Sequence, residues 1–257
     1  MSRRDREPQD PAPPAGFFMS AIGVVRSPFV EAFGVPRQPG LAPVRARVEL
    51  DPRVIALEAL RGLESVTHVW LLFVFHRADP AQTHPTVRPP RLGGNARMGV
   101  LATRSPQRPN PLGLSVVRLL GVDGHTLTVE GVDLLDGTPV LDVKPYVAEV
   151  DRIDDSAVGW LPPPEPPRAV EFAAAAAAAL AATPEPAALR AELVALLQLD
   201  PRPSHRRGDD DDPHAYGMAL GALDVRFEVR GGVDVVLELR ARTNDDGAAS
   251  PAGATAP

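Results

Sequence analysis

Alternating apolar and polar positions are the clearest pattern in the first 160 residues. The segment 44–50 (Val-Arg-Ala-Arg-Val-Glu-Leu) alternates without interruption, which predicts a strand with one buried face. The run 66–75 is largely apolar, β-branched and aromatic, so it predicts a central strand buried on both faces. Many short strands at close spacing predict a mainly β fold, either an antiparallel barrel or a sandwich. The remaining predicted strands are 17–26, 97–103, 112–120, 126–135 and 140–143.

A short helix is predicted between the two strongest strands. Pro52 suits the first position of a helix, because its fixed φ matches and its missing N–H is not needed there. Aliphatic residues then recur at helical spacing, which predicts an amphipathic helix with one buried face. That face is formed by Val54, Ile55, Leu57, Leu60 and Leu63.

The C-terminal part changes to a different pattern. Helices are predicted at 171–180, which contains seven consecutive alanines, and at 185–199. Strands are predicted at 222–229 and 233–239, joined by the two-residue turn Gly231-Gly232. This part is therefore expected to be a small α+β domain. The apolar stripe of its second helix comprises Leu189, Leu193, Leu196 and Leu197.

Proline-rich and low-complexity segments divide the chain. We expect a disordered N-terminal arm at 1–16, a proline-rich linker at 161–168 (Leu-Pro-Pro-Pro-Glu-Pro-Pro-Arg) and a disordered tail at 243–257. These segments delimit a β domain at 17–160 and the α+β domain at 169–242. The chain holds no run of about 18 apolar residues, so no membrane contact is expected and the predicted location is the cytoplasm.

Several classes of chemistry are excluded by what the sequence lacks. With no cysteine, the chain has no disulfide, no thiolate nucleophile and no cysteine-ligated zinc. It has neither the P-loop signature nor the Gly-x-Gly-x-x-Gly fingerprint of a Rossmann nucleotide site. Its six histidines show no metal-ligand spacing, so no metal is expected.

The distribution of charge is informative where its total is not. The net charge is −6, which taken over the whole chain disfavours nucleic-acid binding. Between positions 84 and 118, however, the chain carries six arginines and no acidic residue. Such a segment suits phosphate contacts, although a bias toward GC-rich codons accounts equally for an arginine-rich solvated face, since Lys144 is the only lysine.

Three rigid loops concentrate the candidate chemistry. Loop 33–41 holds two prolines and presents Arg37 and Gln38, which together can hold a carboxylate and other polar groups. Loop 86–113 combines arginines with many prolines and glycines, and a loop of this length inside a compact domain is usually functional. Loop 134–146 contains the turn Asp136-Gly137-Thr138-Pro139, whose carboxylate, hydroxyl and amides suit a sugar or an amine. Each loop can equally be a plain surface connection or hairpin.

Taken together, these loops resemble the TrmO (TsaA-like) family of tRNA methyltransferases. The resemblance rests on five segments that stand close together in the first 150 residues. They are 22–29 (Ile-Gly-Val-Val-Arg-Ser-Pro-Phe), 34–41 (Gly-Val-Pro-Arg-Gln-Pro-Gly-Leu), 62–76, 86–115 (from Thr-Val-Arg-Pro-Pro-Arg-Leu-Gly-Gly-Asn through Arg-Ser-Pro-Gln-Arg-Pro-Asn-Pro-Leu-Gly-Leu-Ser) and 136–146 (Asp-Gly-Thr-Pro-Val-Leu-Asp-Val-Lys-Pro-Tyr). It covers about 21–150 and extends into the C-terminal part at Asp200-Pro201-Arg202-Pro203. It implies an antiparallel β-barrel methyltransferase without a Rossmann fold, acting as a homodimer with the cofactor near the subunit interface.

The resemblance also implies a set of cofactor-binding residues, here named the cofactor set. To it we add, as a hypothesis about the mechanism, a set of RNA-binding candidates, here named the RNA set. The cofactor set, for S-adenosylmethionine, is Pro36, Arg37, Gln38, His76, Arg77, Arg104, Leu114, Asp136, Gly137, Thr138 and Pro139. The RNA set, expected to grip phosphates and orient the modified base, is Arg88, Arg91, Asn95, Arg97, Arg108 and Asn110.

The reaction implied by the resemblance is methyl transfer to N6 of N6-threonylcarbamoyladenosine, next to the anticodon of a threonine tRNA. We expect Arg37 or Arg104 to pair with the cofactor carboxylate, Asp136 to hold its amine or ribose, and Leu114 to pack on its adenine. His76, at the end of the most apolar strand, is the candidate base. The alternatives are a non-catalytic RNA-binding module, or a methyltransferase of this fold acting on another RNA or on a small molecule.

Overall fold

The computed structural model describes residues 16–93 and 96–242. The arm expected at 1–16, apart from Gly16, and the tail expected at 243–257 lie outside the described residues. So does Asn95 of the RNA set. Within the described residues, no helix is both long and apolar enough to cross a membrane.

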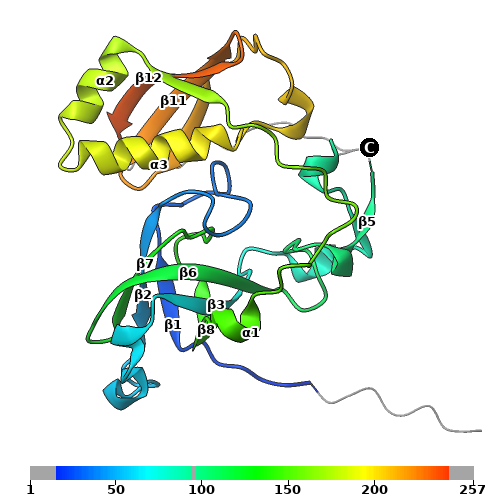
Figure 1. The fold of residues 1–257 in the computed structure, drawn as a ribbon, viewed down its shortest axis with the longest axis vertical. Helices are drawn as coiled ribbons and strands as arrows, with labels where there is room; N and C mark the ends of the chain where they lie inside the picture. Colours follow the sequence, from blue (N-terminus) through cyan, green and yellow to red (C-terminus); the bar gives the residue numbers. More distant parts are fainter. Residues whose placement is uncertain (1–15, 94–95, 243–257) are drawn as a thin grey trace, which may run out of the picture.

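A closed antiparallel barrel forms the N-terminal part, shown in the lower half of Figure 1. Neighbouring strands pair in the order β1-β2-β7-β6-β3-β8, and β8 returns to β1 through Gly23 opposite Val140. The barrel prediction is therefore confirmed. The strands are β1 (Gly23–Arg26), β2 (Arg45–Leu50), β3 (His68–Val74), β6 (Leu112–Asp123), β7 (Thr126–Glu130) and β8 (Pro139–Pro145).

Strand alternation fills the barrel interior. In β2, Ala46, Val48 and Leu50 are buried and the residues between them face outward, as the alternating pattern predicts. In β3 only every second residue is fully buried, so the prediction of burial on both faces was wrong. A barrel strand has one face on the interior, whereas its outer face is buried only where another element covers it, and among the described residues the single-turn helix α1 (Ala148–Asp151) covers the outer face of β3 in part.

The helix predicted after Pro52 is absent, and the segment instead forms turns. Two short 3-10 turns occupy Leu57–Leu60 and Leu63–Ser65. The Asp51 carboxylate accepts a hydrogen bond from the Arg53 backbone N–H as an N-cap would, and the Asp51 carbonyl accepts from Val54 and Ile55, but only this one turn forms. The first turn ends before Arg61, and Gly62 then takes a left-handed φ of 97° where the second turn begins. Of the five apolar residues of the expected face, only Leu60 is buried.

Several predicted strands are shorter in the structure. The strand expected at 17–26 begins only at Gly23, and the one expected at 126–135 ends at Glu130, because Gly131 turns the chain with a φ of 87°. The strand expected at 97–103 is reduced to β5 (Met98–Gly99), which pairs with β4 (Thr86–Val87). The rest of this region is built from 3-10 turns at Pro80–Gln82, Pro90–Leu92 and Val100–Ala102. A single helical turn, α1 (Ala148–Asp151), follows the barrel.

The C-terminal part is a four-stranded sheet with two helices, the upper body in Figure 1. Its strand order is β10-β11-β12-β9, in which β9 runs parallel to β12. The helix expected from 171 begins later, because Glu171 and Phe172 belong to strand β9. Strand β10 was not predicted. The elements are β9 (Ala169–Phe172), α2 (Ala174–Ala181), α3 (Pro186–Gln198), a 3-10 turn at Ser204–Arg206, β10 (Tyr216–Leu220), β11 (Leu223–Arg230) and β12 (Val233–Ala241).

The loop after β1 packs directly onto this C-terminal sheet. The Phe33 ring stacks on Tyr216 and Phe227, with centroids 6.2 and 6.5 Å apart. The Gly221 N–H donates a 2.7 Å hydrogen bond to the Pro28 carbonyl. These contacts fix the start of loop 33–41 against the second part of the chain, which bears on the candidate site.

Candidate functional site

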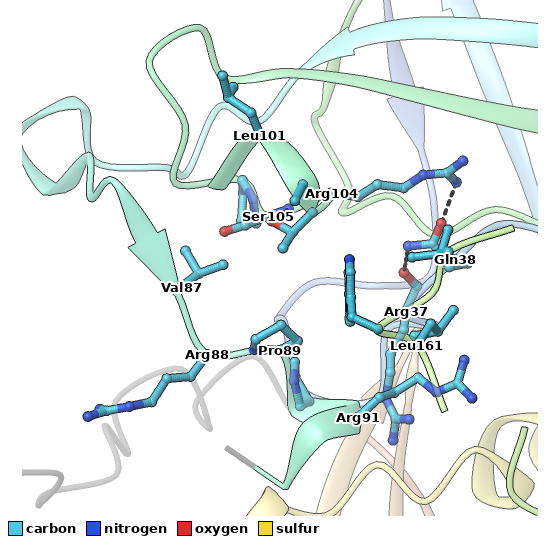
Figure 2. Close-up of a pocket in the computed structure, with 16 residues that line it drawn as sticks. Arg37, Gln38, Val87, Arg88, Pro89, Arg91, Leu101, Arg104, Ser105 and Leu161 are labelled. Atoms are coloured by element: carbon cyan, nitrogen blue, oxygen red, sulfur yellow. Dashed lines mark hydrogen bonds between the residues drawn. The ribbon is translucent and has the colours of Figure 1, made fainter. Parts of the chain in front are cut away.

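A hollow of about 780 Å³ lies between loop 33–41, the segment 87–106 and the residues preceding the proline-rich segment (Figure 2). Its volume falls within the range of small-molecule sites. The lining contains four arginines and no acidic side chain. Its residues are Arg37, Gln38, Val87, Arg88, Pro89, Pro90, Arg91, Leu101, Ala102, Thr103, Arg104, Ser105, Pro106, Val158, Trp160 and Leu161.

Arg104 and Gln38 are held together on one wall of the hollow. Arg104 Nη1 donates a 2.5 Å hydrogen bond to Gln38 Oε1, and Gln38 Nε2 donates to the Arg37 carbonyl at 2.6 Å (Figure 2). The amide of Gln38 therefore links Arg104 to the backbone of loop 33–41. With Nη1 fixed, the exposed guanidinium of Arg104 keeps further donors for an anion.

Arg37 itself reaches toward the C-terminal part. Its Nη2 donates hydrogen bonds to the carbonyls of Leu199, at 2.7 Å, and Asp200, at 3.0 Å. Burial lowers the pKa of the Arg37 guanidinium, and the carboxylates of Glu165 and Asp200 oppose that shift. The side chain stays charged, because the pKa of arginine is far above neutral. A pairing of Arg37 with a cofactor carboxylate remains a prediction, and Nη2 is engaged elsewhere.

The turn at Asp136 is fixed by hydrogen bonds on both sides. Asp136 Oδ1 accepts a 3.1 Å hydrogen bond from the Ser27 backbone N–H. Gly137 has a φ of 78°, a left-handed value that glycine adopts without strain. Thr138 is buried, and its hydroxyl donates to the Leu135 carbonyl at 2.7 Å. The carboxylate thus has a defined position, whereas the Thr138 hydroxyl is used within the turn.

His76 and Arg77 follow the end of strand β3, where His76 feels the charge of the Asp136 carboxylate. Burial and then the charge of Arg77 lower the pKa of the His76 imidazole, while the Asp136 carboxylate opposes them. His76 is therefore unprotonated at neutral pH and can accept a proton. Arg77 Nη1 donates to the Val30 carbonyl at 2.9 Å, which fixes its side chain.

Leu114 lies apart from the main hollow. It points outward from β6 and is 50% exposed, while its neighbour Ser115 points into the barrel and is 2% exposed. Leu114 lines a second hollow of about 430 Å³ on the outer face of β3 and β6. The fold of one chain does not bring this member of the cofactor set to Arg37 and Arg104. The second hollow is lined by Trp70, Leu72, Leu114, Asp142, Lys144, Pro145, Val147, Val150 and Asp151.

Two members of the RNA set line the main hollow, and the other three described members are not among its lining residues. Arg88 and Arg91 line the hollow, and Arg91 Nη2 donates to the carbonyls of Pro162 and Pro163 at 2.5 and 2.8 Å. Arg91 thereby fastens the proline-rich segment beside the hollow. Arg97 Nη1 donates to Thr86 Oγ1 at 3.0 Å, Arg108 Nη1 donates to the Thr103 carbonyl at 3.2 Å, and Asn110 is exposed.

Sequence reasoning missed two features near this site. Asp133, one position before the third loop as defined from the sequence, accepts a hydrogen bond from Ser115 Oγ, and burial raises its pKa to about 6. The signal was Ser115, a polar residue at an inward position of an alternating strand. Trp160 and Leu161 complete one wall of the hollow. Trp160 is one of two tryptophans in the chain, which was the available hint.

Metal ligands are not gathered in the described ranges 16–93 and 96–242. No group of three or more histidine, aspartate or glutamate side chains there is arranged to hold a metal ion. The polar groups of the main hollow are guanidinium, amide and hydroxyl groups, which suit an anionic or hydrogen-bonding ligand.

Both parts of the chain match models of one protein family. Residues 24–152 match the tRNA-methyltransferase O N-terminal domain, and residues 165–242 match the TrmO C-terminal domain. The chain belongs to the tRNA-methyltransferase O family. The motifs of the three loops had already indicated this family from the sequence.

Relatives and solved structures of the family cover almost the whole chain. A putative S-adenosylmethionine-dependent methyltransferase, RcsF, from Pseudomonas aeruginosa is 46% identical over 81% of this chain and 91% of its own length. The tRNA (adenine(37)-N6)-methyltransferase of Escherichia coli is 41% identical over 84% of this chain and 94% of its own. The crystal structure of TrmO from P. aeruginosa superposes with a TM-score of 0.72 at 38% identity, covering 90% of this chain and all of that one.

Proposed function

We propose that this protein transfers the methyl group of S-adenosylmethionine to N6 of adenine 37 in tRNA. The acceptor that we propose is N6-threonylcarbamoyladenosine, next to the anticodon of a threonine tRNA. Family membership over both parts of the chain supports the reaction and the cofactor. The structural observation behind the proposed site is that one hollow is lined by residues of both sets. From the cofactor set these are Arg37, Gln38 and Arg104, and from the RNA set they are Arg88 and Arg91.

The donor groups suit the chemistry of the cofactor. S-adenosylmethionine supplies an activated methyl group on a sulfonium centre, and it also carries a carboxylate and an amine. Arg104, with one nitrogen anchored on Gln38, offers its remaining N–H groups to the carboxylate. Asp136, held by the Ser27 N–H, offers a fixed negative charge to the amine or to ribose hydroxyls.

Catalysis by this chain is proposed to rest on placement and on one proton acceptor. In-line placement of donor and acceptor alone lowers a barrier by roughly 7–11 kcal/mol. His76, unprotonated at neutral pH, is proposed to take the N6 proton as the bond from N6 to the methyl carbon forms and the bond from that carbon to sulfur breaks. The arginines of the RNA set are proposed to hold backbone phosphates.

A homodimer is proposed as the working form. Leu114 faces outward from the barrel into the second hollow, away from Arg37 and Arg104. A second copy could supply Leu114 to a cofactor held by the first copy, which accounts for its place in the cofactor set. Exposed Leu114, Val147 and Val150 give this face an apolar character, as a subunit interface requires. Substituting Leu114 with Asp should convert the dimer to a monomer in analytical ultracentrifugation, and a dimer that persists would remove this part of the proposal.

The domain limits and the location of the protein are part of the proposal as well. We propose a methyltransferase domain at 17–160, a linker at 161–168 and an accessory domain at 169–242. The cytoplasm is proposed as the location, because tRNA is the proposed substrate.

A methyl-transfer assay tests the proposed function. The purified protein is mixed with methyl-labelled S-adenosylmethionine and tRNA carrying unmethylated N6-threonylcarbamoyladenosine, and the digested nucleosides are analysed by mass spectrometry. Label should appear on that nucleoside and should disappear when the tRNA lacks the threonylcarbamoyl group.

The other outcomes separate the alternatives. Cofactor binding without label on this nucleoside would indicate another RNA or a small molecule as acceptor. Neither label nor cofactor binding would leave an RNA-binding module and would contradict the proposed reaction.

A further inference from the structure

The C-terminal end of helix α3 is capped by a residue of the other part of the chain. Helix α3 ends at Gln198, and the last carbonyls of a helix have no partner within it. Arg37 Nη2 binds the carbonyls of Leu199 and Asp200, directly after this end. A cation is favoured there, because the helix dipole places partial negative charge at its C-terminus. The contact spans 162 residues of sequence.

These two carbonyls are themselves held by an unusual turn. Asp200 has a φ of 45°, the only positive φ at a non-glycine residue in the described ranges. Such a backbone conformation persists when the surroundings determine it. The carboxylate of Asp200 accepts from Nε and Nη2 of Arg202, both at 2.8 Å, and from the Arg202 backbone N–H at 3.3 Å.

Arg202 is a fully buried charge with several acceptors. Its side chain is 0% exposed, and its Nη1 donates to the Asp209 carbonyl at 2.9 Å and lies 3.6 Å from the Asp212 carboxylate. A planar guanidinium can bind a carboxylate through two parallel bonds while a third nitrogen reaches elsewhere, and a lysine ammonium cannot. Replacing a buried ion pair with apolar residues is often neutral or stabilising, so stability alone does not account for this buried cluster.

We propose that Arg202 is a positioning residue for the methyltransferase site: through Asp200 it fixes the two carbonyls that hold the Arg37 guanidinium at the wall of the main hollow. The C-terminal part thereby determines the geometry of loop 33–41, including Gln38, which binds both the Arg37 carbonyl and Arg104. This inference rests on the proposed function, because it assigns a role to that same site.

The test compares Arg202→Lys with Arg37→Ala in the full-length protein. Binding of S-adenosylmethionine is measured by calorimetry below the melting temperature of each variant, together with kcat and KM for the methyl transfer. Arg202→Lys should raise the cofactor Kd and KM by about 2- to 30-fold, with kcat changed much less. The double variant should bind no more weakly than Arg37→Ala alone, because both substitutions act on one contact.

Asp234→Asn provides the matched control. Asp234 is 0% exposed and pairs with Arg168 at 2.8 Å within the same C-terminal sheet. Among the described residues its carboxylate makes no hydrogen bond or ion pair with residues 199–202 or with loop 33–41, and it acts on Arg202 only through its charge. This variant should lose thermal stability as Arg202→Lys does, yet keep the wild-type Kd for the cofactor.

Several results would overturn the inference. A wild-type Kd in folded Arg202→Lys, or additive effects in the double variant, would leave Arg202 a purely structural residue while the methyltransferase function stands. If Arg202→Lys does not fold, Asp200→Asn replaces it, and a wild-type Kd there has the same meaning. A wild-type protein that neither binds the cofactor nor methylates tRNA would overturn the proposed function and this inference with it.

Discussion

The Ser115 hydroxyl on β6 donates a 2.7 Å hydrogen bond to Asp133 Oδ1, just after the end of β7. Ser115 is 2% exposed, on the inward face of β6. Burial raises the pKa of the Asp133 carboxyl to about 6, while the Ser115 hydrogen bond and then the positive charge of Arg104 oppose that shift. A carboxyl with such a pKa changes its charge just below neutral pH, close to the candidate site.

The stability of the protein should therefore fall as the pH rises through the pKa of Asp133. The folded state holds this proton up to about pH 6, whereas the unfolded state releases it near 3.8, so the stabilisation is complete below 3.8 and is lost as the pH passes 6. Asp133→Asn should unfold at a higher temperature than wild type at pH 7.5, with a gain of about 3 kcal/mol from the shift between 3.8 and about 6. At pH 4 the two melting temperatures should converge, and a pH-independent difference would contradict the assignment.

Arg104 should contribute to cofactor affinity. Losing a hydrogen bond to a charged group costs about 1.5–3 kcal/mol, so Arg104→Ala should lower kcat/KM for S-adenosylmethionine by about 10- to 100-fold. Arg53→Ala serves as control, because Arg53 is exposed and pairs with Asp51 at the turn after β2. An equal loss in both variants would show a general effect of charge.

The pH dependence of methyl transfer should reflect His76. Because the pKa of His76 lies below its ordinary value of 6.5, kcat should be constant from pH 7 to 8 and should fall as the pH decreases through that lowered pKa. His76→Gln should lose this acidic limb and most of the rate. A variant that keeps the wild-type profile would show that His76 contacts ligand without accepting the proton.

Binding of tRNA should depend steeply on salt. Each arginine that contacts a phosphate contributes about one unit to the slope of log K against log salt, so Arg88→Ala and Arg97→Ala should each reduce the slope by about 1. Both residues are exposed, and Arg88 lines the main hollow. Arg53→Ala should leave the slope unchanged. An affinity that is flat between low and moderate salt would remove phosphate contacts from the proposal.

Gly34 should tolerate no side chain. It has a φ of 86°, and a Cβ there would lie 2.3 Å from Met218 Sδ of the C-terminal sheet. Gly34→Ala should destabilise the protein by about 2–4 kcal/mol, the sum of left-handed strain and overpacking. Gly124→Ala measures the left-handed strain alone, since Gly124 has a φ of 53° and open space around its Cβ position. Equal melting temperatures for the two variants would contradict the close contact.

The local patterns of the sequence determined much of the barrel. Segment 44–50 forms β2 with the predicted alternation, because a period of two needs only one buried face to be satisfied. The leucine stripe at 185–199 likewise forms α3, with Leu193, Leu196 and Leu197 buried. By contrast, the apolar residues after Pro52 form turns, since their spacing suits a helix but the fold buries only Leu60 among them.

The family motifs in the loops could also be recognised in the sequence, but the contacts between the side chains of different loops and strands could not be predicted. That Arg37 would cap helix α3, that Arg104 would bind Gln38 and that Asp133 would meet Ser115 depends on residues between 18 and 162 positions apart. Leu114 was placed with the cofactor set by resemblance, and only the direction of its side chain on β6 separated it from the main hollow. Spacing along the chain determines which face a residue occupies, whereas the closure of the barrel and its packing on the C-terminal sheet decide which faces meet.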